Sequence, residues 1–177
     1  MTRTLAALAA VCALALGCGN ASAPETTPDE AVMAALGTVR ALHHEADVFE
    51  SAGDLDRASQ AIRRVLAIEF PRAMAESEDL RADAYGRLAE LSLRRGAADE
   101  CLSLASTGVH DAHRESVLKA RLWMVRGQCL GALADRAQQS GDATGAAQRR
   151  TEALEALEAS IEMNQRVLRR ITDGGQR

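Results

Sequence analysis

Residues 32–66 read VMAALGTVRALHHEADVFESAGDLDRASQAIRRVL, and this stretch decides the fold class. Its apolar residues recur at steps of three and four, so each half presents one apolar helix face. Gly53 and Asp54 separate the halves, since glycine often ends a helix and aspartate caps the next one. The stretch predicts a helical hairpin that stops at Pro71. The two faces comprise Val32, Leu36, Val39, Leu42, Ala46 and Phe49 before the turn, and Leu55, Ala58, Ile62 and Val65 after it.

The same periodicity continues outward from this hairpin. We expect the first helix to open at Pro28 or Asp29 and a third to run from a capping Ser77 to Gly96. A short helix over 98–107 ends at Gly108, and a long one covers 113–140. The sixth helix follows the turn at Gly141 and has as its inner face Ala147, Leu154, Leu157, Ile161, Leu168 and Ile171. No stretch alternates with period two, so the sequence predicts an all-α fold of about six helices.

The composition agrees with a globular helical domain and argues against nucleic acid as a partner. Charged residues make up 26% and apolar residues 47% of the 177 residues, which is typical of folded domains. The net charge is −4, and the 21 basic residues are spread along the chain. Phosphate binding needs a concentrated positive face, which this distribution lacks.

The sequence contains no pattern typical of an enzyme or a metal site. We find no HExxH motif, no paired-cysteine motif, no phosphate-binding loop and no nucleophile elbow. The histidines come as His43-His44 and as His110 and His113. Adjacent residues point about 100° apart on a helix, so His43 and His44 are poorly placed for one ion. The other two fall in an expected turn. We therefore expect no catalytic, cofactor or metal residues.

The pattern of the amino terminus predicts an export signal. One positive charge at Arg3 precedes an uncharged, mostly apolar run over 5–17, which is too short to span a bilayer. The run ends in Leu14-Ala15-Leu16-Gly17-Cys18. This segment resembles the bacterial lipobox, which implies that the chain is cut before Cys18 and that Cys18 carries the lipid. Such acyl chains anchor a protein stably. The alternative is an ordinary signal cut after Ala21 or Ala23.

The signal divides the chain into four parts. We expect residues 1–17 to be the signal peptide and residues 18–28 to be the lipidated cysteine with a flexible tether. We expect residues 29–172 to form the helical domain and residues 173–177 to form a disordered tail. Gly19 follows the lipidated cysteine, where inner-membrane lipoproteins often have Asp, so the outer membrane is favoured.

Two cysteines remain in the expected helical domain. Cys101 and Cys129 each lie on a predicted helix among apolar neighbours. We interpret them as two buried, unpaired thiols, because free cysteine behaves as a small hydrophobic residue. A disulfide is the alternative, since an exported protein meets an oxidising compartment.

The predicted hairpins repeat. Three times a glycine is followed five residues later by a small residue, in the pairs Gly53 and Ala58, Gly96 and Cys101, and Gly141 and Ala146. This resembles the tetratricopeptide repeat, although the glycines lie 43 and 45 residues apart and the standard period is 34. The resemblance implies a short solenoid of stacked antiparallel hairpins; a plain helical bundle is the alternative. The close-packing positions would be Ala46, Gly53, Ala58, Ala89, Gly96, Cys101, Gly127, Gly141 and Ala146.

The resemblance also implies a function. In tetratricopeptide solenoids the first helix of each hairpin lines a groove that binds a peptide or a protein. The residues that would face such a groove are Arg40, His43, Glu50, Arg87 and Arg94. We therefore expect a non-enzymatic, lipid-anchored protein–protein interaction scaffold in the bacterial cell envelope, at the outer membrane facing the periplasm. The alternative is a periplasmic helical bundle that binds a ligand or a metal.

Overall fold

A computed structural model describes residues 27–72 and 74–174, and this part of the chain is entirely helical apart from its turns. Six helices follow one another, and no strand occurs within these ranges, so the predicted all-α class is confirmed. In chain order the helices are α1 (Pro28–Ser51), α2 (Leu55–Leu66), α3 (Ser77–Arg94), α4 (Ala98–Asp111), α5 (Val117–Gln139) and α6 (Ala143–Gly174).

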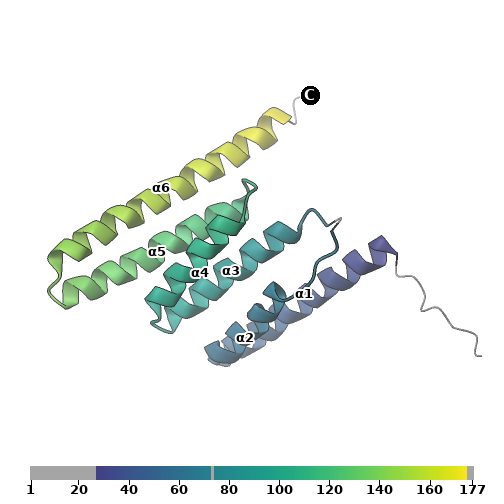
Figure 1. The fold of residues 1–177 in the computed structure, drawn as a ribbon, viewed down its shortest axis with the longest axis horizontal. Coiled ribbons are helices and arrows are strands. Elements are labelled where there is room, and N and C mark those ends of the chain that lie inside the picture. The colour runs from purple at the N-terminus through teal and green to yellow at the C-terminus, as the bar shows by residue number, and fades with distance from the viewer. Residues whose placement is uncertain (1–26, 73, 175–177) are drawn as a thin grey trace, which may run out of the picture.

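The helices pack as three consecutive hairpins (Figure 1). The pairs α1/α2, α3/α4 and α5/α6 each lie side by side, and α3 also contacts α2 and α5. The middle helix α3 therefore joins the first hairpin to the third. Helix α6 packs along α5 at one end of the assembly, and α1 and α2 form the other end. None of the described helices is long and apolar enough to cross a bilayer.

The tight turns inside the hairpins depend on glycine. Gly53, Gly96 and Gly141 have φ angles of +78°, +77° and +84°, in the left-handed region that other residues rarely adopt. After the first turn, the Asp54 side chain accepts a hydrogen bond of 2.9 Å from the backbone N–H of Arg57 and so caps α2. The predicted roles of Gly53 in the turn and of Asp54 as the cap of the second helix are therefore confirmed.

Small side chains fill the crossing points of the helices. Five of the expected packing residues have no exposed surface, namely Ala46, Ala58, Ala89, Cys101 and Ala146. Around the first of these, the core of the first hairpin and α3 contains Ile62, Val65, Leu88 and Leu91. Gly127 faces Leu157 of α6, and a Cβ at this glycine would lie 2.9 Å from Cγ of Leu157. The helices thus approach closely where their residues are smallest.

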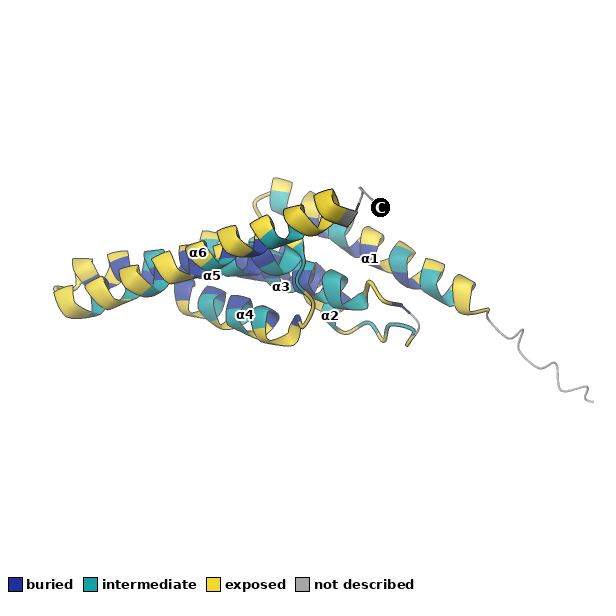
Figure 2. Ribbon diagram, turned by 90° about the horizontal axis from the view of Figure 1, so that it is seen from above, coloured by how far each residue is buried: buried dark blue, intermediate teal, exposed yellow. Residues whose placement is uncertain are grey.

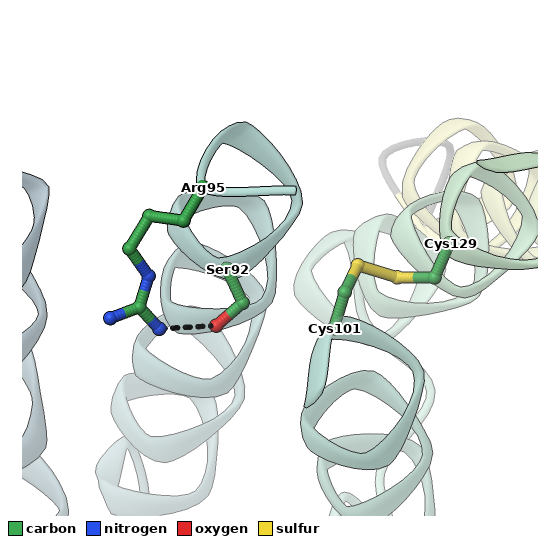
Figure 3. The surroundings of a disulfide bond; sticks show 4 residues. All are labelled: Ser92, Arg95, Cys101 and Cys129. Carbon is green, nitrogen blue, oxygen red and sulfur yellow. Dashed lines mark hydrogen bonds between the residues drawn. A yellow bond between two sulfur atoms is a disulfide. The ribbon is translucent and has the colours of Figure 1, made fainter. Parts of the chain in front are cut away.

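The interpretation of two unpaired thiols is wrong. Cys101 on α4 and Cys129 on α5 form a disulfide, with Cα atoms 5.7 Å apart (Figure 3). Both side chains are fully buried. Sequence periodicity put each residue inward but could not show that the two helices face each other there. The bond ties the second hairpin to the third.

Several predicted boundaries were also wrong. Helix α4 continues through Gly108 to Asp111, so His110 lies in its last turn. Helix α5 begins at Val117 rather than at 113, because the Ser116 side chain accepts a hydrogen bond of 3.2 Å from the backbone N–H of Lys119. Ser77 is the first helical residue of α3 and caps nothing, and α2 ends at Leu66, before Pro71.

The predicted inner face of α6 is the largest correction. Leu154, Ile161, Leu168 and Ile171 are 61%, 57%, 61% and 67% exposed, and Ala147 is exposed as well. Of the predicted face only Leu157 is half-buried, against Gly127 of α5. The buried side chains of α6 are instead smaller or more flexible, namely Ala146, Ala153, Ala156, Ser160 and Met163. The buried hydroxyl of Ser160 donates a hydrogen bond of 2.7 Å to the Ala120 carbonyl of α5. This close approach selects the small-residue face and leaves the large residues outside.

The ends of the chain extend beyond the described residues. Thr27 and Glu30 form a capping box at the start of α1, so the helical domain begins within the expected tether. The helix α6 continues through Gly174, past the expected start of the tail at 173. The signal peptide, Cys18 and most of the tether lie outside the described residues.

Candidate binding groove

Charged side chains gather in a groove between the first helices of the three hairpins. The groove has a volume of about 510 Å³. Its lining comes from α1 (Asp47, Glu50, Ser51), α3 (Arg87, Glu90, Leu91, Arg94) and α5 (Arg121). Three helices that are distant in the chain therefore contribute to one surface.

Arg87 stands at the centre of this groove. Its side chain is only 15% exposed. One guanidinium nitrogen donates to Asp47 and, at 3.0 Å, to Glu50, and the other lies 3.2 Å from Nδ1 of His43. Burial lowers the pKa of Arg87, but the hydrogen bonds that Arg87 donates to Asp47 and Glu50 outweigh this effect, so the pKa lies above its ordinary value. This arginine is fixed in place as a cation between α1 and α3.

Arg121 extends the charged network to α5. It donates at 2.6 Å to Asp83 and through two nitrogens, at 3.1 and 2.6 Å, to the carboxylate of Glu90. Burial again lowers the pKa of Arg121, and the Glu90 and Asp83 carboxylates raise it by more. The paired contact with Glu90 fixes the orientation of the guanidinium.

His43 links the two arginine clusters. Its Nε2 lies 3.8 Å from Oδ2 of Asp83, and its side chain is 20% exposed. Burial lowers the pKa of His43, Asp83 opposes this effect, and Arg87 adds to it. The net shift is downward, so His43 is neutral near pH 7.

The network forms because charged residues recur on one face of each helix. On α3 the positions are Asp83, Arg87, Glu90 and Arg94, which alternate in sign at steps of four, three and four. On α1 the matching positions are His43, Asp47 and Glu50, and Glu50 accepts from Arg94 as well as from Arg87. Together with Arg121 of α5, these seven side chains form a network that we name the charge ladder. Its eight members are His43, Asp47, Glu50, Asp83, Arg87, Glu90, Arg94 and Arg121.

The structure brings together four of the five residues expected to face a groove. His43, Glu50, Arg87 and Arg94 belong to the charge ladder, and the last three of them line the groove. His43 contacts Arg87 without lining the groove, and Arg40 lies on the exposed surface. Sequence reasoning missed Asp47, Asp83, Glu90 and Arg121. The alternating charges along one face of α3 were the signal that could have identified two of them.

Among the described residues, no three His, Cys, Asp or Glu side chains are placed so that they could hold one metal ion together. What the groove offers is a set of oriented charges of both signs on a rigid three-helix surface. Such a surface suits a polar segment that exchanges hydrogen bonds with the ladder. It has no uncompensated charge that would select a strongly acidic or strongly basic ligand.

No protein-family model, curated protein or solved structure matches this chain.

Proposed function

We propose that this chain is an exported, lipid-anchored scaffold without enzymatic activity, and that its groove binds a peptide segment of another envelope protein. The observation that carries the proposal is the charge ladder, in which three helices hold eight charged or titratable side chains in one network, six of them lining the groove. The tetratricopeptide-like pattern of the sequence supports the same use, because the first helix of each hairpin lines the groove.

The disulfide supports the cellular location. Cys101 and Cys129 are bonded within the core, and structural disulfides persist in oxidising compartments such as the bacterial periplasm. Together with the lipobox-like segment before Cys18, this favours export and anchoring at the outer membrane, on the periplasmic side.

Site-specific crosslinking tests the groove. A photoreactive amino acid at Ser51, which lines the groove, should capture one defined partner in intact cells. The same probe at Ser103, an exposed position on α4, is the matched control and should not capture that partner. Equal capture at both positions, or capture at neither, contradicts a partner in the groove.

A substitution separates binding from folding. Arg94 is half exposed and lies in the groove, so Arg94→Glu should leave the fold intact while it places a negative charge beside Glu50. Capture through the Ser51 probe should fall strongly, with an unchanged circular dichroism spectrum. Unchanged capture would show that the partner does not use the charge ladder.

Fractionation tests the anchor independently. Cys18→Ser removes the expected lipid acceptor, so the protein should move from the membrane fraction to the soluble periplasmic fraction. A membrane association that persists in Cys18→Ser would refute the lipid anchor and would leave the groove proposal untouched.

A further inference from the structure

His43 is the member of the charge ladder that can change its charge between pH 5 and pH 8. Its ring lies between a cation and an anion of α3. Nδ1 is 3.2 Å from Nη1 of Arg87, and Nε2 is 3.8 Å from Oδ2 of Asp83. Because arginine has no acceptor atom, Nδ1 must accept the hydrogen bond, and the neutral ring carries its proton on Nε2. The ring nitrogen that faces Arg87 is therefore the one that takes up a proton.

The ring is largely shielded from water. The His43 side chain is 20% exposed. It packs toward α3, in which every residue before Arg94 is buried or half-buried, as Figure 2 shows at the centre of the row of helices. A charge in such surroundings is less screened than one on the open surface. A proton on His43 therefore acts strongly on the groups beside it.

Charges of both signs face the ring from three helices. On α2, which also packs on α1, Arg64 pairs with Glu45 at 2.8 Å rather than with this network. Burial opposes a charge on the ring and lowers the pKa of His43, so the ring is mostly neutral at pH 6.5 and above. The charged groups that act on the ring are Asp47 of α1, Asp83 and Arg87 of α3, and Arg121 of α5.

A proton on Nδ1 of His43 ends the hydrogen bond from Arg87. Two donors, both on cations, then face each other across that contact. The second guanidinium nitrogen of Arg87 still donates to Asp47 and Glu50. Nη1 retains the backbone carbonyl oxygen of His43, at the longer distance of 3.4 Å, and lacks its ring acceptor. Since Arg87 lines the groove, this nitrogen becomes available to an acceptor inside the groove.

The charge balance of the groove changes in the same step. While His43 is neutral, the lining contains three carboxylates and three arginines, so its charges cancel. Protonation places one further positive charge directly beside Arg87. An ionised carboxylate in the groove would meet both this charge and the released Nη1 donor, and hydrogen bonds between ionised groups are the strong ones.

We propose that protonation of His43 makes the groove bind acidic peptide segments, through the nitrogen of Arg87 that His43 releases. The inference rests on the proposed function, because it concerns the regulation of the same groove. Its direction is fixed by charge: acid strengthens the binding of a carboxylate-bearing segment and does not strengthen that of a basic one. The coupling is reciprocal, so a carboxylate bound at Arg87 also favours the protonated ring.

A tetra-aspartate peptide with a pH-insensitive rhodamine label tests the proposal. Aspartate is ionised at both pH 7.5 and pH 5.0, so the charge of the peptide barely changes. Fluorescence anisotropy with the full chain in a neutral detergent should give an affinity about three- to tenfold higher at pH 5.0, as expected for one charge about 6 Å away at an effective dielectric constant of about 40–80. A tetra-lysine peptide with the same label should show no gain.

Two adjacent histidines supply the matched variants. His43→Gln places a neutral side chain whose amide oxygen can accept from Arg87 at every pH, so most of the gain should disappear. His44→Gln changes the exposed neighbour outside the charge ladder and should keep the wild-type response. A gain that survives in full in His43→Gln, or a wild-type chain that does not bind the peptide at pH 5.0, would overturn the proposal.

An NMR titration of the histidine rings gives a second readout. Excess peptide should raise the titration midpoint of His43 by about half to one pH unit and leave that of His44 unchanged. An unchanged His43 midpoint would show that no carboxylate binds at Arg87. Capture through the Ser51 probe decides the proposed function separately. Capture without the pH response refutes only the role of His43, and the pH response without capture refutes only the envelope partner.

Discussion

Gly108 is the position where the packing of three helices can be tested by adding one methyl group. It lies inside α4, where a Cβ would come within 2.7 Å of both Cβ of Tyr85 on α3 and Cδ2 of Leu122 on α5. Contacts this short do not occur, so Gly108→Ala must push the helices apart. Gly131, inside α5, has no heavy atom within 4 Å of the same virtual Cβ and supplies the matched control.

The two substitutions should change the free energy of unfolding by different amounts. Alanine stabilises a helix interior by about 1 kcal/mol relative to glycine, and this gain applies at both positions. Overpacking at Gly108 costs about 1–3 kcal/mol, because the Cβ of Tyr85 is next to the backbone and cannot rotate away. We expect Gly131→Ala to be more stable than wild type by about 1 kcal/mol, and Gly108→Ala to range from about wild-type stability to about 2 kcal/mol below it. The difference between the variants should be about 1–3 kcal/mol.

Urea unfolding followed by circular dichroism at 222 nm measures this difference, with the disulfide intact in both variants. For a chain of this size, 1 kcal/mol corresponds to about 2–4 °C in Tm, so thermal unfolding resolves it as well. Equal shifts for Gly108→Ala and Gly131→Ala would refute the close approach of α3, α4 and α5. Such a result would instead favour the helix end at Gly108 that the sequence predicted.

Three further predictions concern the disulfide, His43 and the first hairpin. Reduction of the bond between Cys101 and Cys129, which are 28 residues apart, should lower the free energy of unfolding by about 3–4 kcal/mol, and an unchanged Tm after reduction would contradict its stabilising role. The pKa of His43 is lowered on folding by burial, so the folded state disfavours its protonation and stability should fall as pH drops below about 6.5 and on through the lowered pKa. His43→Gln should lose less stability than wild type between pH 7 and pH 5 in the same urea assay, and parallel pH profiles would disprove this. Ala58→Leu should cost about 1–3 kcal/mol because Ala58 has no exposed surface, whereas Ala41→Leu on the exposed face of α1 should cost little; equal effects would show that α1 and α2 do not meet at Ala58.

The ion pairs of the charge ladder could not be predicted from the sequence, because their partners lie on different helices. Arg87 could be predicted as a charged residue on one face of α3, but its partners Asp47 and Glu50 come from α1. Arg121 joins from α5 and was not predicted at all. Periodicity assigns a residue to a face of its own helix, and only packing decides which other helix that face meets.

The sequence by itself determined the local features of this protein. Spacing of three and four residues specified helices, and Gly53, Gly96 and Gly141 specified their turns, because these choices depend on backbone geometry within a few residues. Tertiary structure alone decided which apolar face of α6 is buried. That helix has a face of large residues around Ile161 and a face of small ones around Ala156, and both satisfy helical periodicity. The close approach of α6 to α5, where the Ser160 hydroxyl donates to the Ala120 carbonyl, favours the small face, so the chain buries its alanines and leaves most of its larger aliphatic residues exposed.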